Sequence, residues 1–208
     1  MRLVYWFLLL TFLGACSKEE NISIHFNDEI FLDAQINFMR QLENLDSLSM
    51  SSIKAILAKQ DWVESFSLKH QSSQSTKLIL NSRKPLLNWE KAYHVDKNLN
   101  IFSSSGKAID IPLISAPYDK LPDWVFWHDL FKTVLEDHGL KLKEIRFIYG
   151  AGWEIETNEL IIKIGSTINQ EIYEKYQEAL NYVFRKNLNP SIMDLRNLNG
   201  IALNYVKQ

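Results

Sequence analysis

The stretch Ser191-Ile-Met-Asp-Leu-Arg-Asn-Leu-Asn-Gly-Ile-Ala-Leu-Asn-Tyr-Val206 determines how the chain ends. Two alternating runs flank Asn199-Gly200, a dipeptide that accepts the positive φ values of a type I′ turn, so the stretch predicts a closing β-hairpin. The last run alternates between two faces, with Ile201, Leu203 and Tyr205 on one and Ala202, Asn204 and Val206 on the other. A terminal strand lies either inside a sheet or at its edge. At an edge, its free N–H and C=O groups can bind a strand of another chain.

The composition is that of a folded protein. Of the 208 residues, 46% are hydrophobic and 12% are aromatic, and this length allows one or two modest cores. A net charge of −2 and a pI near 6.2 provide no basic surface of the kind that phosphate contacts require, so no nucleic-acid partner is expected. The single cysteine, Cys16, excludes an intrachain disulfide and a zinc site built from cysteines.

The amino-terminal segment, residues 1–20, predicts export. Arg2 precedes an uncharged run from Leu3 to Ser17, which as a helix would span about 22 Å, less than the roughly 30 Å hydrocarbon core of a bilayer. The run ends in Leu13-Gly-Ala-Cys16, which resembles the bacterial lipobox, where the cysteine is lipidated and becomes the new amino terminus. Two interpretations stay open: a lipoprotein signal with Cys16 as the lipidation site, or a short uncleaved signal anchor. Both export everything after residue 20.

Residues 21–84 predict a small α+β domain. An alternating strand at 21–26 is followed by a helix over 32–45 and by a second helix over 49–59, which Ser49 or Ser51 can cap. Two strands around a polar turn at 71–75 complete the order strand, helix, helix, strand, strand. This is the order of the POTRA domain of exported and outer-membrane assembly proteins. Trp62, at a helix-to-strand junction, is expected to fill the core rather than to bind a partner.

Residues 85–208 predict a second, mixed α+β domain with a mainly antiparallel sheet and the closing hairpin. Its expected elements are a hairpin at 93–102, an extended segment at 111–114, a helix at 124–138, strands at 141–148, 152–157 and 160–165, and a helix at 170–186. Gly139 is expected to end the first of these helices. Trp153 is expected to close the apolar face between sheet and helix.

Several motifs between Leu32 and Val206 together resemble the FtsQ/DivIB family of bacterial division proteins. Asp194-Leu-Arg196 followed by Asn199-Gly-Ile-Ala202 is similar to the family's closing signature, Asp-Leu-Arg-Tyr-x-x-Gly-x-Ala-Val. Arg83-Lys-Pro85 before Trp89 resembles its Glu-Arg-x-Pro motif, and Gly150-Ala-Gly-Trp153 resembles its Gly-x-Trp strand pair. The chain departs from the family at Gln71 to Gln74, where the family has Trp-Pro, at Asn197, where it prefers Tyr, and at Tyr205, where some members have Trp.

The resemblance implies a non-enzymatic scaffold of the divisome, held at the cell inner membrane with its bulk in the periplasm, at the division septum. Such a scaffold would link early and late division proteins, and would bind FtsB, FtsL and further septal proteins by strand addition at the closing hairpin. The positions that match for partner binding are Arg196, Asn197, Gly200, Ile201, Leu203 and Tyr205. The predicted turn requires Gly200 whether or not a partner binds.

Two other functions are alternatives. A lipoprotein accessory of outer-membrane protein assembly would share the POTRA-like domain but has no need of the closing hairpin. A cell-wall hydrolase needs a nucleophile or a paired-carboxylate cleft, and the sequence indicates neither. The five histidines have no metal-ligand spacing, and Gly106-Lys107 and Gly150-Ala-Gly152 lack the glycine patterns of phosphate and dinucleotide loops. His128-Asp129 is expected to be a solvated pair. The sequence therefore predicts no metal, cofactor or small-molecule substrate.

Overall fold

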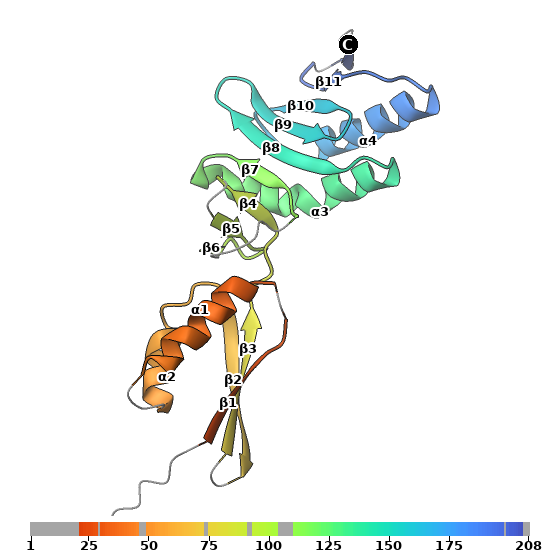
Figure 1. Ribbon diagram of the computed structural model, residues 1–208. Helices are drawn as coiled ribbons and strands as arrows, with labels where there is room; N and C mark the ends of the chain where they lie inside the picture. Colours follow the sequence, from red (N-terminus) through yellow and green to blue (C-terminus); the bar gives the residue numbers. More distant parts are fainter. Residues whose placement is uncertain are drawn as a thin grey trace, which may run out of the picture.

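The protein is a mixed α+β structure in which two sheets follow one another along the molecule (Figure 1). The computed structural model describes residues 21–28, 30–45, 49–72, 75–90, 93–103, 110–197 and 199–205. The predicted anchor with Cys16, the turn residues 73–74, Gly106-Lys107 and Val206 lie outside these residues. In the part of the chain that is described, no helix is both long and apolar enough to cross a membrane.

The first sheet has the predicted order of elements. These are β1 (Asn21–Phe26), α1 (Leu32–Glu43), α2 (Met50–Leu57), β2 (Val63–Ser72) and β3 (Ser75–Ser82). The sheet order is β1-β3-β2, with β1 parallel and β2 antiparallel to β3. Ser49 caps α2 as predicted, because its Oγ accepts the N–H of Ser52 at 3.2 Å. The POTRA-like order is thereby confirmed.

The two helices cover one face of this sheet and bury a compact apolar cluster. Phe38, Ile53 and Leu78 are completely buried. Trp62 is 2% exposed, and its indole N–H donates to Gln60 Oε1 at 2.9 Å, so the one polar atom of the ring is paired. The prediction that Trp62 fills the core is confirmed.

The second sheet is built from the rest of the chain. Its elements are β4 (Leu87–Trp89), β5 (Tyr93–Val95), β6 (Ile101–Phe102), β7 (Leu113–Ser115), the 3₁₀ turn η1 (Tyr118–Lys120), α3 (Leu121–Asp137), β8 (Leu142–Ile148), β9 (Gly152–Thr157), β10 (Ile161–Gly165), α4 (Gln170–Arg185), β11 (Ile192–Asp194) and β12 (Ala202–Asn204). The strand order is β12-β11-β10-β9-β8-β7-β4-β5-β6, and most neighbours are antiparallel.

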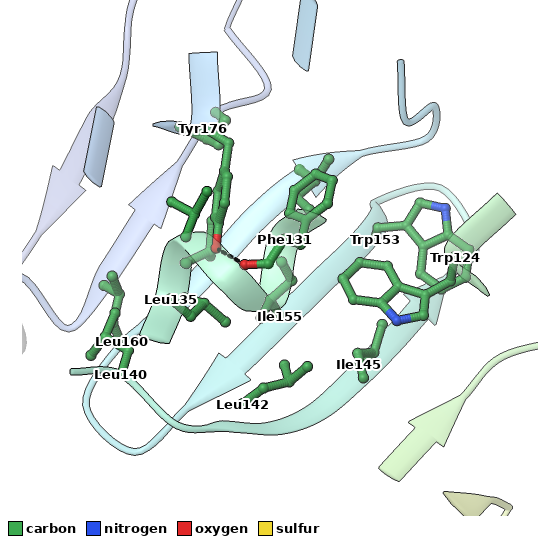
Figure 2. Close-up of a cluster of buried hydrophobic side chains, with 14 of the residues drawn as sticks. Trp124, Phe131, Leu135, Leu140, Leu142, Ile145, Trp153, Ile155, Leu160 and Tyr176 are labelled. Atoms are coloured by element: carbon green, nitrogen blue, oxygen red, sulfur yellow. Dashed lines mark hydrogen bonds between the residues drawn. The ribbon is translucent and has the colours of Figure 1, made fainter. Parts of the chain in front are cut away.

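Helices α3 and α4 pack on one face of this sheet around a set of buried aromatic rings (Figure 2). Trp124 of α3 and Trp153 of β9 are fully buried, with ring centroids 5.7 Å apart. The hydroxyl of Tyr176 on α4 donates to the carbonyl of Phe131 on α3 at 3.0 Å, which ties the two helices together inside the core. The predicted role of Trp153, closing the face between sheet and helix, is confirmed.

A close approach of two glycines sets the spacing between β9 and β10. Gly152 has φ +88°, and a Cβ built on it would lie 2.0 Å from the carbonyl carbon of Gly165. Every residue other than glycine therefore collides with the backbone of the neighbouring strand. Glycine at position 152, directly before Trp153, accordingly has a steric reason in this fold.

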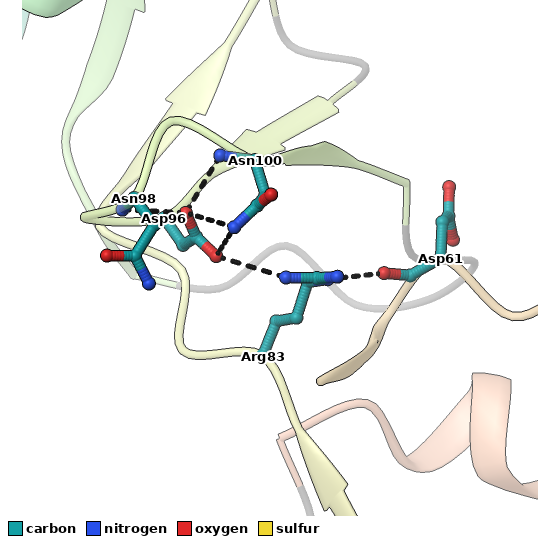
Figure 3. Close-up of polar contacts among 5 residues, drawn as sticks. All are labelled: Asp61, Arg83, Asp96, Asn98 and Asn100. Carbon is teal, nitrogen blue, oxygen red and sulfur yellow. Dashed lines mark hydrogen bonds and ion pairs between the residues drawn. The ribbon is translucent and has the colours of Figure 1, made fainter. Parts of the chain in front are cut away.

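A polar junction joins the two sheets (Figure 3). Arg83 donates from Nε to the carbonyl of Asp61 at 2.8 Å, and its other end lies 3.4 Å from Asp96 Oδ2. Asp96 is 5% exposed and accepts the backbone N–H groups of Asn98 and Asn100, each at 2.9 Å, which closes the β5–β6 turn. Leu99, with φ +63°, takes the left-handed position expected of a glycine. A domain boundary near residue 84 stays a prediction.

The closing hairpin differs from the prediction. β11 and β12 pair antiparallel, with Asp194 opposite Ala202, so the segment 195–201 separates them instead of a two-residue turn. Gly200 does not have a positive φ, which a type I′ turn requires, and a Cβ on it would meet nothing within 4 Å. The prediction of that turn, and of a steric need for Gly200, is therefore wrong. Lys175 of α4 donates to two backbone carbonyls of this segment, those of Leu195 and Asn197.

Candidate partner-binding edge

Strand β12 lies at one end of the nine-stranded order, and β11 is its neighbour among the described strands. One side of β12 thus faces no other described strand, as the edge-strand alternative requires. In Figure 1 this end of the second sheet lies at the far end of the molecule from β1. Unpaired N–H and C=O groups along such an edge are a template for an added strand.

The register identifies which backbone groups face outward. The carbonyl of Ser191 and the N–H of Leu195 bond to β10, at 3.0 Å and 2.8 Å. Because backbone groups alternate in direction along a strand, those of Ile192 and Asp194 face β12, and the residues opposite them on β12 face back. Leu203, which lies between those two residues of β12, therefore directs its own N–H and C=O to the free side.

The side chains of the last run divide between the core and solvent. Ile201 and Leu203 are half-buried and pack against the large apolar cluster. Ala202 and Asn204 are exposed, and Tyr205 is 53% exposed. Of the predicted contact residues on this run, Ile201 and Leu203 thus serve the protein's own core, and Tyr205 is the one that presents an aromatic ring to solvent.

Arg196 is held beside the edge by Asp194. Its Nε donates to Asp194 Oδ1 at 2.9 Å, and this hydrogen bond holds the pKa of the Asp194 carboxyl below its usual value. The same carboxylate raises the pKa of Arg196. The Arg196 side chain remains 41% exposed, so its charge is available to a partner, while an exposed pair of this kind contributes little stability by itself.

The loop before β12 is fixed by a lysine that sequence reasoning did not single out. Lys175 of α4 donates to the carbonyl of Leu195 at 2.8 Å and also to that of Asn197. Asn197 and Gly200 are exposed in this loop. Lys175 precedes its acceptors by about twenty residues, so no local pattern indicates the contact.

A hollow of about 490 Å³ lies between α4 and this loop. It is lined by Glu171, Glu174, Lys175, Glu178, Ala179, Tyr182, Gly200 and Ile201. Gly200 and Ile201 directly precede β12, so the hollow borders the free edge.

The described residues contain no group of three or more His, Cys, Asp or Glu side chains able to hold a metal ion. The prediction of a solvated His128-Asp129 pair is half wrong. Asp129 is exposed and pairs with Lys97 at 2.7 Å, but His128 is 2% exposed and accepts the indole N–H of Trp124 at 3.2 Å. Burial lowers the pKa of His128 to about 4. Helical spacing places residue 128 on the same inward face as Trp124.

The fold and the edge define a class: a two-sheet α+β protein with a POTRA-like first sheet and a free terminal strand. The chain is similar to the cell division protein FtsQ of Neisseria meningitidis serogroup B, at 24% identity over 146 residues, and to that of Neisseria gonorrhoeae, at 23% over 146 residues. These matches cover 69% of the chain, and 62% and 60% of the two relatives. No family model matches the chain. The predicted resemblance to the FtsQ/DivIB family is confirmed, over less than two thirds of each relative's length.

Proposed function

We propose that this chain is a cell-division scaffold that binds its partners by strand addition to β12. The observation that carries the proposal is the free side of β12, where Leu203 directs its backbone groups outward. The similarity to FtsQ supports the process, cell division. A role in assembly rather than in catalysis accords with a site made of backbone groups.

The partners we propose are FtsB and FtsL, with other septal proteins joining the same assembly. Backbone hydrogen bonds to Leu203 would supply affinity, and side chains at the edge would supply specificity. Tyr205 and Arg196 are the exposed side chains best placed for this. Asn197 replaces the aromatic residue that the family prefers, and loss of one aromatic anchor costs about 1 kcal/mol or more of affinity.

The membrane side of the proposal rests on the amino-terminal segment. Residues 1–20 would hold the chain at the inner membrane, either as an uncleaved anchor or through lipidated Cys16, with residues 21–84 and 85–208 as two domains in the periplasm at the septum. Mass spectrometry of the membrane fraction distinguishes the two anchors, since lipidation begins the mature chain at Cys16 with an added diacylglycerol mass.

Capture of FtsB and FtsL from the same organism by the full chain tests the proposal. Leu203→Pro removes the outward N–H and leaves the β11–β12 hydrogen bonds, which do not use it. Leu203→Ala is the matched control, because it loses the same packing side chain and keeps the N–H. Capture is expected to fall at least tenfold in the proline variant relative to the alanine variant. Equal capture by both, with each folded by circular dichroism, would refute strand addition at β12.

Tyr205→Ala and Arg196→Glu report on specificity. Each is expected to weaken capture, and the Arg196→Glu effect is expected to shrink at high salt, since an exposed charge is screened. Failure of the wild-type chain to capture either protein would remove FtsB and FtsL as partners.

A further inference from the structure

The face of the first sheet that is turned away from α1 and α2, called the outer face here, carries side chains of β1, β3 and β2 in rows set by the strand register. Along β3, Thr76, Leu78 and Leu80 are buried under the helices, so the alternate residues lie on the outer face. Strand register places residues of this outer face in rows. One row is Ser23, Lys77 and Lys69, the next is His25, Ile79 and Ser67, and the one after it contains Asn81 and Ser65.

This outer face has basic residues and no acidic ones among its described members. Lys69 lies directly opposite Lys77, and like charges in that position destabilise a sheet. The ion pairs of the described residues involve neither lysine. The neighbouring serines are small, so a planar, phosphate-rich surface can approach the sheet closely. The face is therefore complementary to an anionic surface.

The chain outside the structure enters beside the lysine row. Asn21 pairs with Ser75 and Ser23 with Lys77, so the row lies two residues from the first described residue. Figure 1 shows the start of β1 at this end of the molecule, far from β11. The apolar run ends at Ser17, and only residues 18–20 separate it from Asn21, so the Cα atoms of Ser17 and Asn21 lie at most about 14 Å apart. The linker contains one lysine and two glutamates, so it adds no basic cluster of its own.

We propose that this outer face lies on the anionic phosphate headgroups of the membrane that holds the chain. The ammonium groups of Lys69 and Lys77 and the hydroxyls of Ser23 and Ser67 would donate to lipid phosphates. Each lysine near such a surface favours contact about fivefold, which corresponds to about 1 kcal/mol. A tether of three residues makes the contact intramolecular, so two lysines suffice to bias it. The proposal rests on the membrane anchoring proposed above.

Contact through one defined face has a consequence for the partner-binding edge. It fixes how the molecule is oriented on the membrane, and hence the direction in which β12 is presented. Partner capture in detergent does not depend on that orientation.

Photo-crosslinking in nanodiscs tests the proposal on the full chain. A photoreactive amino acid at position 67 reports contact of the outer face with lipid, and one at position 149, which is 78% exposed in the second sheet, is the reference. Discs of phosphatidylcholine alone are compared with discs that also contain phosphatidylglycerol. Lipid adducts at position 67 are expected to rise at least fivefold with phosphatidylglycerol, with no such rise at position 149.

Charge variants assign the effect to the lysine row. Lys69→Gln/Lys77→Gln is expected to abolish the rise, and Lys69→Arg/Lys77→Arg to retain it. Lys54→Gln/Lys59→Gln, which makes the same charge change on the helix side, is the matched control and is expected to retain it. The proposal would be overturned if phosphatidylglycerol did not raise the yield of lipid adducts at position 67, or if the rise persisted in the Lys69→Gln/Lys77→Gln variant.

A wrong anchor and a wrong membrane-facing surface give different results in these experiments. If the chain does not enter discs, the proposed anchor is wrong, and flotation with phosphatidylglycerol vesicles then tests the face directly. Flotation that the Gln pair loses and the control pair keeps supports the face, and absence of flotation overturns it. The Gln pair is expected to capture FtsB and FtsL like the wild type, so strand addition is tested independently.

Discussion

The buried His128 predicts a specific loss of stability in mild acid. His128 is 2% exposed, and burial lowers its pKa to about 4 from an ordinary value of 6.5. The hydrogen bond from Trp124 reinforces this, because it occupies Nδ1 and so requires the neutral ring with its proton on Nε2. The folded protein therefore binds this proton much less readily than the unfolded chain does.

The difference between the folded-state and unfolded-state pKa of His128 sets how the free energy of unfolding changes with pH. Above pH 6.5 both states are neutral at this residue and His128 has no effect on the pH dependence. Below pH 6.5 the unfolded chain takes up the proton first, so the free energy of unfolding falls, and it continues to fall until the pH passes the folded-state pKa. Between pH 7 and pH 5 the loss is about 2 kcal/mol, and the full effect of the shift is about 3.4 kcal/mol.

Urea unfolding followed by tryptophan fluorescence at pH 7, 6 and 5 measures this loss. His128→Asn is the matched variant, because its side-chain oxygen can accept the Trp124 N–H while the amide does not titrate. The wild type is expected to lose about 2 kcal/mol more than the variant over this range. Every other titrating group, including His94, whose pKa burial also lowers, is common to both proteins and cancels in the comparison. Equal losses in the two proteins would refute the reasoning.

Two further predictions concern the glycine contact and the junction between the sheets. Gly152→Ala is expected to cost about 4 kcal/mol or more in the free energy of unfolding, because its Cβ would lie 2.0 Å from the Gly165 backbone and its φ is positive. Gly200→Ala, which has open space and no positive φ, is expected to be neutral or to stabilise by up to about 1 kcal/mol, and a comparable loss in both would contradict the steric account. Asp96→Ala is expected to cost about 2–4 kcal/mol by denaturant unfolding, because it removes the buried acceptor of the Asn98 and Asn100 N–H groups and of Arg83. Asp129→Ala is its control: the Lys97–Asp129 pair is exposed, so its loss is expected to cost under about 1 kcal/mol, and an Asp96 variant no less stable than this control would rule out the junction as a stabilising feature.

Predictions that depend on local periodicity agree closely with the structure. The strand at 21–26 and the strand at 152–157 have the expected bounds, and Gly139, with φ +73°, follows α3 as its expected stop. These features depend on alternation, helical spacing and the conformational freedom of one residue, which are properties of short stretches. The resemblance to FtsQ was likewise readable from motifs in chain order.

The prediction for His128, which depended on a distant contact, was wrong. Apolar residues alone do not indicate that His128 faces inward, and the sequence therefore predicted a solvated His128-Asp129 pair. In the structure Leu130 is 43% exposed and His128 is buried, because the sheet meets the helix along the row of Trp124, His128 and Phe131. Which of two adjacent stripes of α3 is buried depends on the sheet that packs against the helix, and not on the helix alone.

The sequence by itself determined the order of elements, the α+β class and the apolar and aromatic residues from which the two cores are drawn, since these follow from short-range patterns. Only the tertiary structure decided the position of β12 at the edge, the outward direction of the Leu203 backbone, and the wide loop that Lys175 holds in place of a tight turn. Tertiary pairing likewise brought Lys69 opposite Lys77. Each of these is a relation between separate segments of the chain. Backbone groups, which are common to all residue types, take part in the hydrogen bonds that set it, so the pattern of side chains alone does not specify it.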